Sequence, residues 1–230
     1  GKYHIAYNIL EMNLKTFPDY IFTFSDFWND STRIPLQPKH IISVGWPFLE
    51  EKVDYYTSLQ LKYSKTRILF ISAANIGHQL SKVALKIASK LDSSKYEIIY
   101  KLHPGEFYNW QSEYPWLLKT NIEVIDNRGM EIHAYLSQSD IQVGVSSTAI
   151  FEGLAYKLKT IIYKLPGHEY MTDLINKNVA ILVENCNQLI SVVESNLIQD
   201  TVDVENYWKF DSKNNILKEI DKILLNDNKI

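Results

Sequence analysis

The chain of 230 residues has a formal net charge of -3, with 46% hydrophobic and 22% charged residues, the composition of a globular protein with a sizeable core. No dense block of lysine and arginine occurs, which excludes nonspecific nucleic-acid binding, and no stretch has the ~18 apolar residues needed to span a bilayer. The single cysteine, Cys186, excludes an internal disulfide and is typical of a reducing compartment, so we predict a cytoplasmic protein that could still contact the inner face of a membrane.

Two short apolar runs lie in the first fifty residues. Residues 19–24 (DYIFTF) and 41–44 (IISV) have the aromatic and β-branched content typical of strands, and prolines break the segment between them. Two strands do not make a doubly wound domain, so we expect residues 1–50 to be the end of a preceding α/β domain. Residues 51–65, rich in charge and tyrosine, are then predicted to connect it to a second domain.

From residue 66 onward, strands and helices alternate. Short β-branched runs are predicted as strands, and apolar residues at helical spacing follow them. The predicted strands are residues 67–72, 97–102, 122–125, 141–145, 160–163 and 180–183, with helices over about 80–91, 130–137 and 148–156. This alternation predicts βαβ units and a Rossmann-like, mostly parallel sheet with helices on both faces. We therefore predict an α/β fold in which residues 66–200 form the second domain.

The end of the chain has the pattern of an amphipathic helix. Ser212 is its candidate N-cap. The apolar stripe consists of Ile216, Leu217, Ile220, Ile223 and Leu224.

Three hydroxyl-bearing residues follow the fourth strand of the alternating region. Ser146, Ser147 and Thr148 lie where residues 141–145 end and the next helix begins. Free backbone N–H groups at a helix N-terminus, together with hydroxyls, are the donors that a diphosphate needs. An isolated Ser or Thr there is more often a helix cap, but three in a row are more than a cap needs. Glu152, one turn further on, can accept hydrogen bonds from ribose hydroxyls or interact with the helix dipole.

A histidine stands at the end of a second strand. His103 follows residues 97–102 and precedes Pro104, which keeps it out of helical geometry. Such a side chain can donate to a phosphate oxygen or protonate it as it leaves, and a polar loop residue is the simpler alternative. In an open α/β sheet, ligands bind outside the carboxyl ends of the strands. His103 and the serine run are therefore predicted to hold one phosphorylated ligand, an activated sugar.

Further candidate residues follow the other strands. Asn75, Gly77 and His78 come after the first strand, where glycine lets a backbone approach a ligand closely, and we predict that they contribute to the phosphate site. The segment is not GxGxxG, so the dinucleotide fingerprint is missing. The loop after the third strand is predicted to lie beside the nucleobase and consists of Arg128, Gly129 and Met130.

The remaining histidines and the motifs that are missing give weaker evidence about the function. His168 and Glu169 follow the fifth strand, at the same predicted edge, whereas His4, His40 and His133 are predicted to be structural or exposed. No HExxH, CxxC or DxD grouping occurs, so we predict no protein-bound metal. The sequence GVSST at residues 144–148 lacks the second glycine of a hydrolase nucleophile elbow.

Three segments of the sequence resemble a known family. The sequences KLHP at residues 101–104, SSTAIFEGLA at 146–155 and KTIIY at 159–163 resemble the C-terminal, nucleotide-sugar-binding half of GT-B glycosyltransferases. The similarity is to bacterial surface-polysaccharide enzymes: polysialyltransferases, capsule Kdo transferases and CDP-glycerol glycerophosphotransferases. It implies that His103, as the catalytic residue, and the serines contact the phosphate of a CMP- or CDP-activated donor. It also implies that Glu152 lies near the ribose.

The resemblance also implies an activity and a domain organisation. It predicts inverting, metal-independent transfer of a sugar or polyol phosphate, without a cofactor, to a glycan or lipid-linked acceptor of the bacterial surface. Residues 1–50 would be the last part of the N-terminal GT-B domain, and residues 201–230 a helix packing back toward it. The acidic general base of such enzymes lies in the N-terminal domain, so this chain alone is expected to bind donor, and its capacity for transfer stays open.

Two alternatives remain at this point. UDP-N-acetylglucosamine 2-epimerases share the GT-B fold, although the further acidic and histidine groups expected of them are not evident here. A nucleotide-sugar-binding or assembly subunit without catalytic activity would use the same phosphate-binding motifs.

Overall fold

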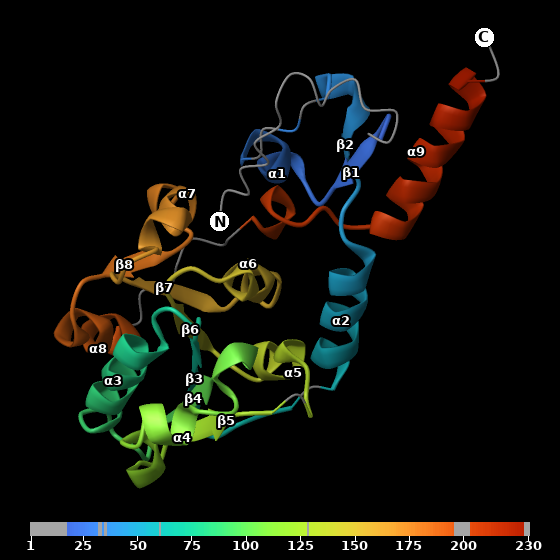
Figure 1. The fold of residues 1–230 in the computed structure, drawn as a ribbon. Coiled ribbons are helices and arrows are strands. Elements are labelled where there is room, and N and C mark those ends of the chain that lie inside the picture. The colour runs from blue at the N-terminus through green and yellow to red at the C-terminus, as the bar shows by residue number, and fades with distance from the viewer. Residues whose placement is uncertain are drawn as a thin grey trace. The chain divides into compact units, whose positions relative to one another are not determined.

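The computed structural model describes residues 18–31, 34, 36–59, 61–127, 129–195 and 203–227 (Figure 1). The chain divides into two compact units, one of residues 55–202 and one of residues 2–54 together with 203–230. Of the predicted residues, His4 and Arg128 lie outside the described part of the chain. Within the described part, no helix is both long and apolar enough to cross a membrane.

The larger unit is built on a six-stranded sheet in the order β5-β4-β3-β6-β7-β8, and every strand pair is parallel. The strands are β3 (Thr66–Ile71), β4 (Tyr96–Lys101), β5 (Glu123–Ile125), β6 (Ile141–Gly144), β7 (Lys159–Tyr163) and β8 (Ile181–Val183). This is the strand order of a Rossmann fold, in which the order of successive strands across the sheet reverses between the two central strands. The predicted fold class is therefore confirmed, and the reversal lies between β3 and β6.

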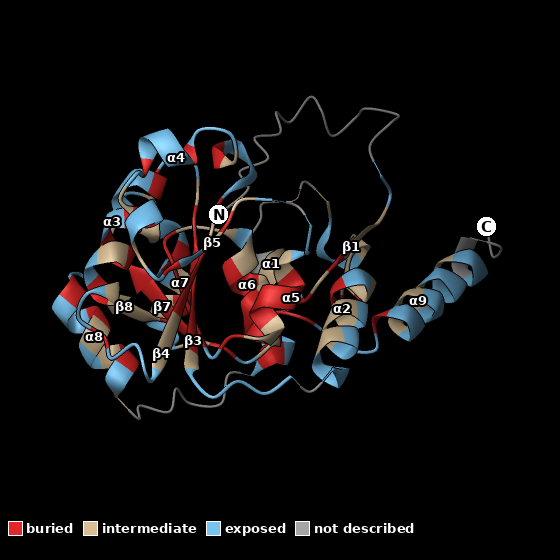
Figure 2. Cartoon of the chain, turned by 90° about the horizontal axis from the view of Figure 1, so that it is seen from below, coloured by how far each residue is buried: buried red, intermediate tan, exposed pale blue. Residues whose placement is uncertain are grey.

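Helices cover both faces of this sheet. They are α3 (Gly77–Ala88), α4 (Trp110–Glu113), α5 (Ile132–Ser137), α6 (Thr148–Ala155), α7 (Thr172–Asn176) and α8 (Cys186–Glu194). Figure 2 shows α5 and α6 on one side of the strands and α3 and α8 on the other. Because both faces are covered, β3 is buried from its second residue onward and β6 along its whole length, rather than at alternate residues.

Two clusters of side chains hold the helices to the sheet. Phe70 and Tyr100 stack face to face and join the apolar residues of α3 and α8 in the main core. On the opposite face, the buried Gln142 donates from Nε2 to the Ile150 carbonyl of α6 at 2.9 Å and to Thr160 Oγ1 at 2.9 Å. The α6 helix is thereby fixed to the middle of the sheet.

The smaller unit contains two parallel strands, β1 (Ile21–Thr23) and β2 (Ile41–Ser43). Its helices are α1 (Asp26–Ser31), α2 (Pro47–Ser58), which continues into the larger unit, and α9 (Ser212–Asp227). An aromatic cluster packs it together: Phe24 lies 5.0 Å from Trp46 and 5.4 Å from Trp208, between ring centroids. Both strands were predicted, although β1 is shorter than the apolar run that predicted it.

The start of α9 differs from the prediction. Ser212 is the first helical residue, and its hydroxyl donates to Glu50 of α2 instead of capping the helix. The Glu50 carboxylate also accepts from the backbone N–H of Asp211 at 2.8 Å and of Ser212 at 3.0 Å. Burial raises the pKa of Glu50, but these hydrogen bonds outweigh it and lower the pKa below its ordinary value. A carboxylate from another helix therefore supplies the cap.

Candidate functional site

The N-terminus of α6 opens at the carboxyl end of β6. Ser147 has extended backbone angles, and its Oγ accepts from the Ala149 N–H at 3.3 Å, so this serine is the helix N-cap. Thr148 is exposed and Ser146 is half-buried. Gly167, with φ near +101°, brings the loop after β7 so close that an added Cβ would lie 2.9 Å from Ser146 Oγ. Ser146 therefore packs closely against the loop that follows β7.

His103 is exposed and caps the short turn that follows β4. Its Nδ1 accepts from the Gly105 N–H at 3.1 Å. A nitrogen that accepts cannot carry the proton of a neutral imidazole, so this contact places the proton on Nε2. The ring therefore offers an N–H donor at the carboxyl end of the sheet.

A buried carboxylate holds the His103 turn in place. Glu106 Oε2 accepts from the His103 backbone N–H at 2.6 Å, while Oε1 accepts from Ser72 Oγ at 3.0 Å and from Tyr114 OH at 2.8 Å. Burial and the neighbouring carboxylate raise the pKa of Tyr114, so its hydroxyl stays protonated and donates. Glu106 links the ends of β3 and β4, which the sequence analysis missed, although glutamate three residues after His103 has capping-box spacing.

The loop after β3 has a different local role from the one predicted. An added Cβ on Gly77 would lie 1.7 Å from Glu106 Oε1 and 2.6 Å from Tyr114 OH, so this glycine permits close packing of buried side chains. The exposed His78 ring lies 5.1 Å from the Trp116 ring, in an edge-on contact. Asn75 is exposed. Phosphate contacts from this loop remain a prediction.

A second group missed by the sequence analysis joins α5 to α6. His133 is only 3% exposed, and its Nε2 lies 3.3 Å from Oε2 of Glu152. Its Nδ1 lies 3.2 Å from the hydroxyl of Tyr156. Burial raises the pKa of the Glu152 carboxyl and of the Tyr156 hydroxyl. His133 is structural, as predicted, but its ring also faces the carboxylate of a predicted site residue.

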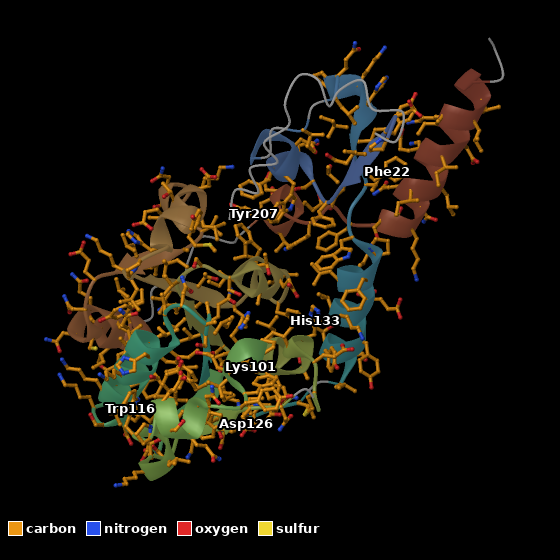
Figure 3. All side chains as sticks on the ribbon, viewed as in Figure 1. Phe22, Lys101, Trp116, Asp126, His133 and Tyr207 are labelled. Carbon is orange, nitrogen blue, oxygen red and sulfur yellow. The ribbon has the colours of Figure 1, made fainter. Side chains whose placement is uncertain are left out.

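A lysine lies at the carboxyl end of β4, beside β5. Lys101 ends β4, and Figure 3 labels it together with Asp126, which follows β5. Burial lowers the pKa of Lys101, against the carboxylates of Asp126 and Glu106, which raise it. Its Nζ lies 4.8 Å from the Phe107 ring centroid. A cation thus stands at the edge predicted to face phosphate.

The predicted nucleobase loop is partly described. Asn127 Oδ1 accepts from the Gly129 N–H at 2.9 Å, which shapes the turn after β5, and Met130 is 49% exposed. On the other side of the sheet, Glu169 accepts from the Gly167 N–H at 2.9 Å and lies 3.3 Å from His168 Nδ1. The loops described here follow the carboxyl ends of strands in one parallel sheet, so they lie at one edge of it.

A cavity of about 410 Å³ lies away from this edge, at the amino-terminal end of β3, lined by residues 61–66 and 137–140. The nearby Arg67 is paired with Glu97 at 3.0 Å and with Glu123 at 3.5 Å, so its charge is compensated. Among the described residues, no group of three or more His, Cys, Asp or Glu side chains could hold a metal ion.

Comparison with known proteins identifies the fold. Neither protein-family models nor curated protein sequences gave a match. Among solved structures, UDP-GlcNAc 2-epimerase from Methanocaldococcus jannaschii superposes with a TM-score of 0.63 at 17% identity, covering 89% of this chain and 62% of that protein. The enzyme from Neisseria meningitidis, bound to UDP-GlcNAc, gives 0.63 at 14% identity, covering 89% and 61%. The chain has the fold of part of a GT-B enzyme, with a Rossmann-like parallel sheet.

A third structure with this fold is a polymerase. The wall teichoic acid polymerase TagF superposes with a TM-score of 0.59 at 14% identity, covering 92% of this chain and 57% of that protein. The chain spans about three fifths of the length of these proteins. The predicted resemblance to the C-terminal half of GT-B enzymes is confirmed at the level of the fold.

Proposed function

We propose that this chain is the nucleotide-sugar-binding half of a GT-B glycosyltransferase, which transfers a sugar or polyol phosphate to a glycan or lipid-linked acceptor. The observation that carries the proposal is the placement of hydrogen-bond donors at the carboxyl ends of the two strands that flank the central strand β3. The capped N-terminus of α6 follows β6, and the Nε2–H of His103 follows β4. Anions bind at such helix termini.

These donors suit the chemistry of the proposed reaction. When the bond to the transferred group breaks, negative charge develops on the phosphate of the departing nucleotide. Fixed N–H donors at that position stabilise the charge more in the transition state than in the bound donor. His103 can stabilise it as a donor or deliver its Nε2 proton to the leaving oxygen. The reaction then needs neither a metal nor a cofactor, and we favour a CMP- or CDP-activated donor.

A second candidate function is epimerisation of UDP-GlcNAc at C2. The two epimerase structures, with TM-scores of 0.63, favour it, and the M. jannaschii enzyme has also been solved in complex with UDP-GlcNAc and UDP. Both candidates share the phosphate site and differ in donor and product. A nucleotide-sugar-binding subunit without catalytic activity would share the site as well.

Calorimetry tests the shared part of the proposal. The chain is titrated with CMP, CDP, UDP and GDP in the presence of a chelator, and we expect saturable binding of a pyrimidine nucleotide. Binding of none of the four would overturn the proposal. Incubation with UDP-GlcNAc, followed by NMR of the sugar, separates the candidates: appearance of the C2 epimer assigns the epimerase and rejects the transferase.

A further inference from the structure

The two carboxylate oxygens of Glu152 have different surroundings: one faces a buried histidine and the other has no partner among the described residues. Its side chain is 15% exposed, and Oε2 faces His133 Nε2 at 3.3 Å. Within the described residues, no hydrogen bond or ion pair involves Oε1. A desolvated carboxylate is costly unless donors satisfy it. A ligand hydroxyl at Oε1 would therefore complete the coordination of this group.

The polar contacts in this cluster form a single chain. The Glu152 carboxylate favours a proton on the ring nitrogen that faces it, which places the His133 proton on Nε2, 3.3 Å from Oε2. In the neutral ring Nδ1 is then an acceptor, and the Tyr156 hydroxyl donates to it at 3.2 Å. The order is Tyr156 to His133 to Glu152, and it ends at the open oxygen.

The positions of these residues direct that oxygen toward the candidate site. Glu152 and Tyr156 are four residues apart, on one face of α6 and its C-cap, so a single imidazole can bridge them. Helical side chains lean toward the helix N-terminus, which directs Glu152 back toward Ser147. His133 lies in the first turn of α5, shortly after Met130. The cluster thus connects the predicted nucleobase loop to the helix that carries the phosphate site.

We propose that His133 and Tyr156 are positioning residues that hold Glu152 for the ribose of the donor nucleotide, and that they make the site select ribonucleotides over 2′-deoxyribonucleotides. The inference rests on the proposed function, since it requires a nucleotide at this edge. An acidic side chain accepting from ribose hydroxyls is a general means of recognition in Rossmann-like sheets. The new element is the pair of a buried imidazole and a half-buried phenol that position the carboxylate.

The test compares affinities for CDP and 2′-deoxy-CDP, and for UDP and 2′-deoxy-UDP, by calorimetry. A hydrogen bond to a charged group predicts a preference of about tenfold or more for the ribonucleotide, equivalent to about 1.4 kcal/mol. His133→Leu removes the donor to Glu152 and should reduce the preference toward one. His133→Gln, which keeps an N–H donor, should restore part of it. The ratio of ribonucleotide to deoxyribonucleotide affinity is informative, because a general loss of structure weakens the binding of both nucleotides equally.

Tyr156→Phe provides a second variant that removes only one oxygen atom, in case His133→Leu does not fold. Tyr156→Phe should lower the ribonucleotide preference. Tyr163→Phe is the matched control and should leave the preference unchanged, because Tyr163 OH contacts Cys186 in the core. If both His133→Leu and Tyr156→Phe bind nucleotides with the wild-type preference, the positioning role is wrong while the donor site stands. Equal wild-type binding of ribo- and deoxynucleotides also overturns the inference. Absence of all nucleotide binding instead rejects the proposed function.

Discussion

Ser147 allows the helix-cap and phosphate-binding roles to be measured separately. Its Oγ accepts from the Ala149 N–H at 3.3 Å, so Ser147→Ala removes the cap whatever else the residue does. The expected loss is about 1 kcal/mol of unfolding free energy, or roughly 2–4 °C in melting temperature for a protein of this size. Ser147→Asp retains a good capping group but places a carboxylate where the donor phosphate is proposed to bind.

The two roles therefore predict opposite patterns across the series. If Ser146 and Ser147 hold phosphate, each hydrogen bond contributes on the order of 1.5–3 kcal/mol. The double change to alanine should then weaken nucleoside diphosphate binding by roughly a hundredfold or more. Ser147→Asp should be as stable as the wild type and bind more weakly than Ser147→Ala, because like charges repel.

The assay measures melting temperature and nucleotide affinity on the same protein samples. Ser146→Ala is the matched variant, because Ser146 is not the cap and should lose affinity with little loss of stability. The decisive result is the aspartate variant. Wild-type affinity in Ser147→Asp would refute phosphate binding at this helix N-terminus.

Three further predictions concern other parts of the structure. Gly153→Ala should lower the unfolding free energy by about 1–3 kcal/mol, because its Cβ would lie 2.1 Å from Gln142 Oε1 in the core, whereas Gly129→Ala, at an exposed turn, should change the melting temperature little. Glu50→Gln should lower the unfolding free energy measured by urea titration at neutral pH. Because the folded-state pKa of Glu50 is lowered, the wild-type advantage should disappear as falling pH protonates this carboxylate. A difference in unfolding free energy that stays constant with pH would contradict the capping role. His103→Ala should weaken donor binding or transfer with an unchanged circular dichroism spectrum, and loss of the folded state would mark His103 as structural.

The sheet could be predicted because buried parallel strands leave a local signal. β3 and β6 are covered on both faces, and each is a short run rich in apolar residues that is followed by small or polar residues. The predicted limits of these strands agree with the observed ones to within about one residue, as the hydrogen-bond ladder defines them. The predicted strand ends also gave the positions of the loops, and so placed His103 and Ser147 at the ends of strands.

Contacts between residues distant in sequence could not be predicted in this way. Glu106 is buried against Ser72 and Tyr114, which belong to other segments, and only its spacing from His103 was visible. His133 lies in the buried face of α5, where a polar residue requires a partner, but the sequence does not name Glu152 as that partner. Ser212 failed as a cap because a carboxylate from α2 competes for the same amides, and local propensity carries no information about it.

These distant contacts determine how rigid the candidate site is before any ligand arrives. The His103 turn is tied through Glu106 to the end of β3, and α6 is tied through the buried Gln142 to the middle of the sheet. Both donor groups therefore rest on core hydrogen bonds rather than on exposed loop contacts. A preformed site loses less conformational entropy on binding, so more of each phosphate hydrogen bond contributes to affinity. A nucleotide at this edge should accordingly bind with little rearrangement of the loops after β4 and β6. Selectivity among nucleotides should then depend on the more exposed nucleobase loop and on Glu152.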